Sequence, residues 1–193
     1  MDPFRNYTIT SPYGDRISPI NKKKEKHTGI DLVIAHQADI HAFVEGKCLF
    51  AQLAGLGTGV GGFGNTVLIL DKNKYLHLYG HLDSVCVKEN DIVAIGQVIG
   101  KQGNTGQSAG SHLHYEVRTR FSPSYGWRTD TNPTEYLLKY FNEDGTEKLT
   151  EANSNEIINI LAKAWRESKS GTEKDRIHEL ANILRKETNQ KIK

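Results

Sequence analysis

The stretch Ser111-His112-Leu113-His114-Tyr115-Glu116-Val117 decides how the first part of this sequence folds. From His112 to Val117 the residues are rich in aliphatic, aromatic and β-branched side chains, which favours a short β-strand. Successive side chains of a strand point to opposite faces, so His112 and His114 are expected on one face. Imidazole is a common metal ligand, so the pair also marks a candidate metal site, although alone it is a weak signal.

Three further segments before this stretch have the composition of strands. They are Val44–Phe50, Thr66–Leu70 and Tyr75–Tyr79, and the last two are separated by Asp71-Lys72-Asn73-Lys74, which predicts a hairpin turn. Residues 1–140 also hold 16 of the 18 glycines and all five prolines, so turns are frequent. Short strands with frequent turns predict a mainly β domain with an antiparallel sheet.

The composition changes after residue 140. Apolar residues recur at helical spacing twice, first from Ile157 to Trp165 and then from Ile177 to Leu184. Gly171 separates the two runs, and we therefore expect an α-helical hairpin. The predicted organisation is a β domain over 1–140, a linker over 141–150 and the helical hairpin over 151–193. From residue 141 onward ten basic residues balance ten acidic ones, so the tail is not a basic nucleic-acid arm.

Composition and charge exclude several classes of protein. The 193 residues carry a formal net charge of +2, which gives no overall field for nucleic acid. There is no run of 18 apolar residues, so no membrane span is expected. The two cysteines, Cys48 and Cys86, cannot make a disulfide framework and are expected to be free thiols. The first residues lack the basic start and apolar stretch of a secretory signal peptide.

Two other motifs extend the candidate metal site. His27 and Asp31 are four residues apart in His27-Thr28-Gly29-Ile30-Asp31, and His81 lies in Tyr79-Gly80-His81-Leu82. Imidazole and carboxylate are the usual ligands of a catalytic zinc ion, which takes three protein ligands and leaves one position open. Each motif by itself is common by chance, but their combination is informative.

The ordered combination resembles the M23 family of zinc metalloendopeptidases, which includes lysostaphin and the LytM-type cell-wall hydrolases. The resemblance covers roughly residues 10–138 and does not include the tail. The segments that carry it are Ser11–Arg16, His27–Leu32, Gly62–Val67, Gly96–Gly100, Gly103–Gly106, Ser111–Glu116 and Asn132-Pro133. Many family members have a tyrosine shortly before the first metal histidine. Asn21–Lys26 contains none. Tyr13 is a distant candidate, and this departure from the family pattern leaves the role unassigned.

The resemblance implies an M23/LytM-type fold and a set of site residues. One Zn²⁺ per chain would be bound by His27, Asp31 and His114, and His81 and His112 would be the two catalytic histidines. A neutral imidazole is a suitable general base. The other histidine would stabilise the oxyanion. The sequence leaves open which of the two is the base.

The implied activity is zinc-dependent hydrolysis of a peptide bond in the stem or cross-bridge of peptidoglycan. Two alternatives stay open: a non-catalytic LytM-like module that binds the wall or activates another hydrolase, and a zinc N-acetylmuramoyl-L-alanine amidase. Glu116 and His77 are candidates for supporting the site imidazoles through hydrogen bonds. The glycine-rich stretch 55–64 is expected to form a loop beside the substrate groove.

The setting and the partners follow from the same interpretation. Peptidoglycan is the expected substrate, and neither nucleic acid nor a membrane span is expected. Without an export signal, we expect a phage or prophage endolysin that stays in the host cytoplasm until holin-type release. Helical segments as short as 151–193 are marginal on their own, so docking or self-association through the tail is expected.

Overall fold

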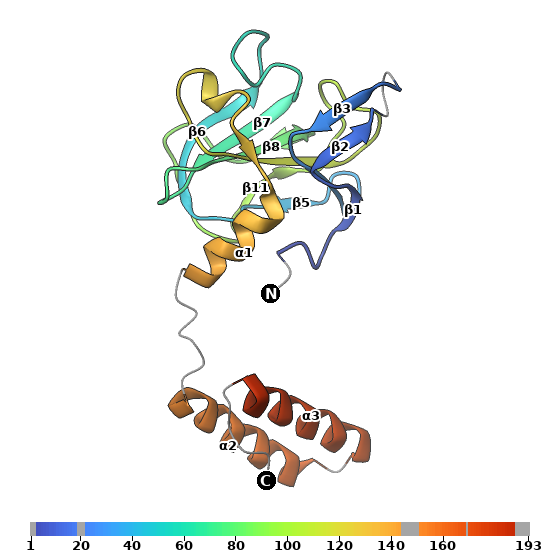
Figure 1. Ribbon diagram of the computed structural model, residues 1–193, viewed down its shortest axis with the longest axis vertical. Helices are drawn as coiled ribbons and strands as arrows, with labels where there is room; N and C mark the ends of the chain where they lie inside the picture. The colour runs from blue at the N-terminus through green and yellow to red at the C-terminus, as the bar shows by residue number, and fades with distance from the viewer. Residues whose placement is uncertain (1–2, 19–21, 144–150, 169, 188–193) are drawn as a thin grey trace. The chain divides into compact units, whose positions relative to one another are not determined.

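The computed structural model describes residues 3–18, 22–143, 151–168 and 170–187. The chain divides into two compact units, residues 1–140 and 141–193. The first unit is built of strands, with one α-helix at its end, and the second is a pair of helices (Figure 1). The mainly β fold with a C-terminal helical hairpin is therefore confirmed.

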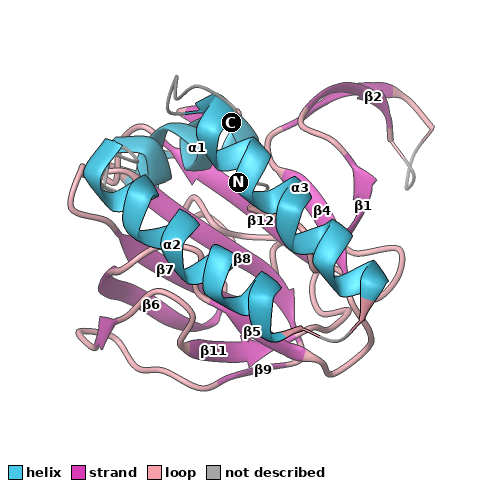
Figure 2. Ribbon diagram, turned by 90° about the horizontal axis from the view of Figure 1, so that it is seen from below, coloured by secondary structure: helices cyan, strands magenta, loops and turns pink. Residues whose placement is uncertain are grey.

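The strands of the first unit form one large sheet and two small ones. The order in the large sheet is β1-β4-β12-β8-β7-β6-β10, with β13 also paired to β12, and every pairing is antiparallel. Its strands are β1 (Thr8–Ser11), β4 (Ile30–Val33), β6 (Gly46–Leu53), β7 (Asn65–Leu70), β8 (Leu76–Leu82), β10 (Ile92–Val93), β12 (Leu113–Arg118) and β13 (Asp130–Thr131). Figure 2 shows β12, β8, β7 and β6 running side by side.

The two small sheets complete the first unit. One contains β5 (Asp39–His41), β11 (Val98–Lys101) and β9 (Ser84–Val85), and the other is the pair β2 (Gly14–Ile17) and β3 (Lys24–His27). The four predicted strands correspond to β6, β7, β8 and β12, and the predicted turn joins β7 to β8. Asp71 fixes this turn, because its carboxylate accepts a hydrogen bond from the Tyr75 backbone N–H at 2.8 Å.

The two faces of the central strands carry different kinds of side chain. Tyr115 of β12 and Tyr79 of β8 are paired across the strands and pack with Phe43 on one face. On the other face, Leu78 packs with Phe50, Leu68, Leu76 and Val60, and Val60 comes from the glycine-rich loop. His114 alternates with Tyr115 along β12, so it lies on this second face.

The helix α1 (Pro133–Glu143) is not among the elements that the sequence predicted. The side chain of Asn132 accepts a hydrogen bond from the Thr134 backbone N–H at 3.1 Å, and Pro133 occupies the first helical position. Tyr136 and Tyr140, four residues apart, are buried. The capping Asn132 and the four-residue spacing of the two tyrosines are signals by which a sequence predicts a helix. The predicted linker 141–150 thus begins inside α1, and 144–150 lie outside the described residues.

The second unit consists of α2 (Glu151–Glu167) and α3 (Gly171–Glu187). Ile158 of α2 and Ala181 of α3 are buried, and the Lys174 ammonium lies 4.6 Å from the centre of the Trp165 ring. Gly171 starts the second helix. None of the described helices is both long enough and apolar enough to cross a membrane.

Candidate metal centre

Three side chains from three strands meet at one end of the large sheet. His27 ends β3, Asp31 lies in β4, and His114 of β12 is paired with Asp31 across the strands. Asp31 Oδ1 lies 3.1 Å from His27 Nε2 and 2.9 Å from His114 Nδ1, and the two nitrogens are 3.2 Å apart. All three residues are at most 8% exposed. Three ligand atoms converging in this way form a candidate metal site.

The hydrogen bonds of the outer nitrogens fix how the two imidazoles are turned. His27 Nδ1 lies 2.8 Å from the Pro12 carbonyl oxygen, so this nitrogen carries the proton and Nε2 faces the site. His114 is turned the other way, with Nε2 3.4 Å from Glu116 Oε2 and Nδ1 facing the site. Two imidazole nitrogens and one carboxylate oxygen are a donor set that suits Zn²⁺ with an open position. The residues present therefore fit the metal that the sequence implied.

The electrostatics of the cluster favour an ionised Asp31. Burial raises the pKa of the Asp31 carboxyl, but its contacts with the imidazoles of His112, His114 and His27 outweigh burial and hold that pKa well below its usual range. The second oxygen, Oδ2, accepts a hydrogen bond from Arg16 Nη1 at 2.9 Å. One carboxylate oxygen is thus held outside the ligand cluster while the other belongs to it.

A buried ion pair between Glu116 and Arg118 contacts the outer ring nitrogen of His114. Glu116 Oε1 accepts a 2.6 Å hydrogen bond from Arg118 Nε, and Thr28 Oγ1 donates to Glu116 Oε2 at 2.9 Å. Burial raises the pKa of the Glu116 carboxyl, but the hydrogen bond from His114 and the Arg118 guanidinium outweigh burial and keep it below its usual value. Glu116 is therefore an ionised acceptor for the outer nitrogen of His114, as the sequence interpretation suggested.

Arg118 also joins two loops to this ion pair. It is fully buried, and its Nη1 donates to the backbone carbonyls of Gly59, at 3.0 Å, and Tyr125, at 2.8 Å. Gly59 belongs to the glycine-rich loop, and its φ of +85° is accessible to glycine at little cost. A Cβ at this position would come within 1.9 Å of the Ser124 carbonyl oxygen. The glycine thus allows the two loops to lie against each other.

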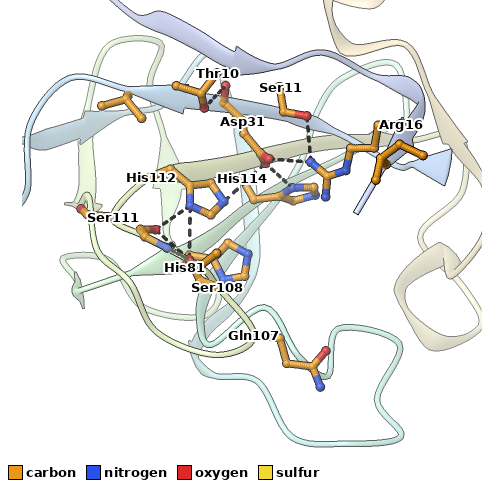
Figure 3. A pocket seen from close by; sticks show the side chains of 14 residues that line it. Thr10, Ser11, Arg16, Asp31, His81, Gln107, Ser108, Ser111, His112 and His114 are labelled. Atoms are coloured by element: carbon orange, nitrogen blue, oxygen red, sulfur yellow. Dashed lines mark hydrogen bonds and ion pairs between the residues drawn. The ribbon is translucent and has the colours of Figure 1, made fainter. Parts of the chain in front are cut away.

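His112 and His81 lie beside the three candidate ligands. His112 Nδ1 is 2.8 Å from the Gly110 carbonyl oxygen, and its Nε2 is 3.4 Å from Asp31 Oδ1. His81 Nδ1 is 2.7 Å from the Thr105 carbonyl oxygen, and the two rings are 4.8 Å apart between centroids. Because a carbonyl only accepts, each ring carries a proton on Nδ1, and Nε2 is the acceptor whenever the ring is neutral. Figure 3 shows these rings with Asp31 and His114.

His81 reaches this position through an exceptional backbone conformation. Regular alternation along β8 would place His81 on the same side as His77 and Tyr79, but its ring lies on the other side, against His112 and His114. His81 has a φ of +60°, and its N–H donates to the Phe63 carbonyl at 2.6 Å. This conformation turns the ring toward His112 and His114. Burial and the neighbouring His114 lower the pKa of His81 to about 4.

His77 is not part of the candidate site. It is fully buried on the opposite face, with Nδ1 2.7 Å from the Tyr115 hydroxyl and Nε2 3.1 Å from Asp71 Oδ2. The Tyr136 hydroxyl of α1 donates to the same Asp71 oxygen. His77 therefore connects the β7–β8 turn, β12 and α1 rather than supporting a metal ligand. Tyr13 also lies apart from the site, because its hydroxyl donates to Asp130 Oδ2 at 2.9 Å.

The ligand cluster opens into a cavity of about 460 Å³. Its walls come from β1, β2 and the segment that precedes β12 (Figure 3). The lining residues are Thr10, Ser11, Arg16, Ile17, Asp31, Val33, His81, Gln107, Ser108, Ala109, Gly110, Ser111, His112 and His114. The sequence interpretation gave no role to Arg16, to Arg118 or to the 107–110 wall. Arg16 lies within the Ser11–Arg16 motif, which was the available signal.

Comparisons with known proteins agree with this arrangement. The profile of peptidase family M23 matches residues 25–128, more than half of the chain. The chain is 36% identical over 123 residues to the DD-carboxypeptidase/endopeptidase Mpg of Neisseria meningitidis, a match that covers 64% of this chain and 27% of that protein. The chain thus spans about a quarter of the length of this relative.

Solved structures show the same fold. The catalytic domain of the antimicrobial peptidase lysostaphin from Staphylococcus simulans superposes with a TM-score of 0.59 at 28% identity, covering 70% of this chain and 95% of that domain. A zinc-containing peptidase from Vibrio cholerae superposes with a TM-score of 0.53 at 27% identity, covering 66% of this chain and 36% of that one. By its sequence match, its fold and its arrangement of histidines and aspartate, the chain belongs to peptidase family M23.

Proposed function

We propose that this protein is a zinc-dependent endopeptidase that hydrolyses a peptide bond in the stem or cross-bridge of peptidoglycan. The observation that carries the proposal is the buried cluster of His27, Asp31 and His114 with two further imidazoles beside it. Membership of family M23 supports a peptidase, and the 32% identity over 108 residues to the peptidoglycan DD-endopeptidase ShyA of Vibrio cholerae supports a peptide substrate in peptidoglycan.

The zinc ion would be held by His27 Nε2, Asp31 Oδ1 and His114 Nδ1. When bound, it would supply Lewis-acid chemistry, polarising the substrate carbonyl and lowering the pKa of water. The protein orients this donor set through the Pro12 carbonyl, Arg16 and Glu116, which hold the outer atoms of the three side chains. Such outer contacts fix imidazole tautomers and raise ligand affinity.

Proton transfer is assigned to the two remaining imidazoles. In a neutral ring Nε2 is the acceptor, and Nε2 of His112 is 3.4 Å from Asp31 Oδ1, next to the ligand cluster. We therefore assign His112 as the general base that takes the proton of the attacking water, and this proton then goes to the leaving amine. His81 lines the same cavity as His112, and we assign it to hydrogen bonding with the oxyanion that forms on the substrate.

The proposal is tested by incubating purified peptidoglycans of several wall types with the protein, with and without a chelator, and analysing the products by mass spectrometry. New free amines that disappear with chelator and return with added zinc are expected. The fragment masses also separate a peptide bond from the sugar–peptide amide that an amidase would cut. If zinc is bound and no wall type yields fragments, the enzyme proposal is wrong and a binding or hydrolase-activating module takes its place.

Two variants separate metal binding from turnover. His114→Ala should lose zinc, and activity with it, because one of three ligands is removed. His112→Ala should keep about one zinc per chain and lose roughly 10²- to 10⁴-fold in rate. Metal analysis after dialysis and product release measure the two effects. A His112→Ala protein of normal activity would show that His112 is not the base, and the same assay on His81→Ala would then test the second ring.

The biological setting is part of the same proposal. A role in phage lysis, with holin-type release from the host cytoplasm, is the setting that the sequence suggested. It stays a prediction, as does self-association through residues 151–193.

A further inference from the structure

The cavity next to the candidate metal ligands carries an unusual distribution of charge. Of its lining residues, only Arg16 and Asp31 belong to the permanently charged types, and Asp31 is a candidate metal ligand. A zinc ion would more than compensate the charge of Asp31, so the ligand cluster would be positive with the metal bound. Beside it, Arg16 is the one Lys or Arg side chain among the lining residues, and a substrate in this cavity would meet it.

The guanidinium of Arg16 is held by three side chains and is still open to the cavity. Nε donates to Glu25 at 2.9 Å, and Nη1 donates to Ser11 Oγ at 2.8 Å and to Asp31 Oδ2 at 2.9 Å. Within the described residues, Nη2 has no hydrogen-bond partner. The Arg16 side chain is 23% exposed. A fixed guanidinium with one unused amino group, Nη2, loses little conformational freedom when it binds an anion.

Arg16 also lies where two cavities meet. Together with Ile17 it lines both the cavity of about 460 Å³ at the metal ligands and a second one of about 560 Å³ along β2 and β3. Since Nη1 contacts the carboxylate that also provides Oδ1 to the ligand cluster, the unused Nη2 of Arg16 is within roughly two residues' length of that cluster, where the reacting bond would lie. A chain bound across the site would therefore pass Arg16.

We propose that Arg16 binds a free carboxylate of the substrate within about two residues of the scissile bond. The Nη2 amino group can donate to a carboxylate oxygen, and hydrogen bonds between ionised partners are about twice as strong as neutral ones. This inference rests on the proposed peptidase function and adds to it a substrate class: peptides with a free carboxylate beside the cleaved bond, as distinct from peptides that are uncharged there.

The experiment compares one substrate in two forms. Soluble cross-linked muropeptide dimers are used directly or after their free carboxylates are converted to amides with a carbodiimide and ammonia. The full-length zinc-loaded protein should cleave the free-carboxylate form with a kcat/KM at least tenfold higher. Arg16→Gln should reduce this ratio to near one. Arg16→Lys keeps the charge but has no guanidinium to bind Glu25, Ser11 and Asp31 while Nη2 stays free, so it should give an intermediate ratio.

The ratio of the two kcat/KM values separates the loss of the carboxylate contact from the other effects of Arg16→Gln. Arg16→Gln also removes a partner of Asp31, so both substrate forms are expected to react more slowly, and zinc content is measured alongside. The matched control is Lys101→Gln, which removes an equally charged, ion-paired side chain that does not line the cavity. This variant should keep the preference of the parent protein.

Three results would overturn the inference. These are equal cleavage of both forms by the parent protein, a preference that survives in Arg16→Gln, and a preference that Lys101→Gln also loses. Failure of the proposed function is recognised separately, as cleavage of neither form. In that case, calorimetric binding of the two dimers decides: binding that needs both the carboxylate and Arg16 supports the inference, and binding that needs neither overturns it.

Discussion

His114 shows most clearly how single contacts set up the candidate metal centre. Its Nδ1 faces Asp31 and His27 because its Nε2 is directed at Glu116, and Glu116 is in turn held by the buried Arg118. Burial lowers the pKa of His114, but the carboxylates of Asp31 and Glu116 outweigh burial and raise it. A carboxylate behind a ligating imidazole increases its basicity and fixes its orientation.

Replacing Glu116 by glutamine should therefore weaken zinc binding without removing a ligand. We expect a loss of affinity of about 10- to 100-fold, because the amide cannot supply the charge that the imidazole and Arg118 share. Competition with a zinc-binding dye measures the affinity. Glu89→Gln, an exposed change elsewhere, should bind zinc like the parent protein. An unchanged affinity in Glu116→Gln would show that the ion pair does not support the ligand.

At the scale of elements, the ligands are brought together by a very short connection. Only Thr28 and Gly29 separate β3, which carries His27, from β4, which carries Asp31. A Cβ on Gly29 would lie 2.4 Å from the Tyr115 carbonyl oxygen and 2.7 Å from His114 Nε2. The connection therefore requires glycine at position 29, where its backbone lies against β12.

Gly29→Ala is expected to lower the unfolding free energy by about 1–3 kcal/mol, the usual cost of overpacking. It should also weaken zinc binding, because the new methyl group pushes against a ligand. Chemical denaturation and dye competition report the two effects. Gly55→Ala is the control, since its Cβ would meet nothing closer than Thr58 Cγ2 at 3.8 Å. Equal stability of both variants would contradict the close approach at Gly29.

The opposite face of the sheet joins its elements through a buried polar cluster. Asp71 in the β7–β8 turn, His77 in β8, Tyr115 in β12 and Tyr136 in α1 are connected by hydrogen bonds. Burial lowers the pKa of His77, although Asp71 opposes this effect. The neutral ring is therefore the form that the fold accommodates.

Stability should fall as the pH falls through the range where His77 takes up a proton in the unfolded chain. The unfolded pKa is about 6.5 and the folded one is lower, so the contribution of His77 is complete above about pH 6.5 and is lost below it. The slope from one proton is at most about 1.4 kcal/mol per pH unit. His77→Gln cannot titrate and should show a flatter pH dependence in denaturation of the zinc-free protein between pH 7 and 5. Equal slopes would contradict this assignment.

At the scale of the whole molecule, the chain consists of two units that each have their own packing. All candidate ligands lie in the first unit, and α2 and α3 pack on each other around Ile158 and Ala181 in the second. A ligand stabilises the unit that holds its site, by about 4.1 kcal/mol at a concentration 1,000 times its dissociation constant.

Removing the metal should therefore change the unfolding of one unit only. In scanning calorimetry of the full chain, a chelator is expected to lower the transition of the first unit and leave that of the helical hairpin in place. Loss of helical circular dichroism identifies the second transition. Adding zinc in excess of the chelator should restore the original profile. A single transition that shifts as a whole would contradict independent unfolding.

Local patterns were sufficient for much of the fold. The ordered motifs led to the five predicted site positions, and the roles of these residues stay predictions. The composition around Thr66, Tyr75 and Leu113 predicted strands that the structure contains, and helical spacing predicted α2 and α3. Strand alternation failed at His81, because a positive φ there reverses the side on which the ring lies. A residue with that conformation cannot be recognised from strand periodicity, which assumes regular backbone angles.

The sequence by itself determined the family, the mainly β architecture, the helical tail and the residue types that could bind a metal. These follow from local spacing and from ordered motifs, which a linear chain displays directly. Only the tertiary structure decided which atoms face the site, that Glu116 and Arg118 stand behind His114, and that Arg16 borders the cavity. The physical reason is that these contacts join residues up to 88 positions apart, as between Thr28 and Glu116, and strand pairing alone brings them together.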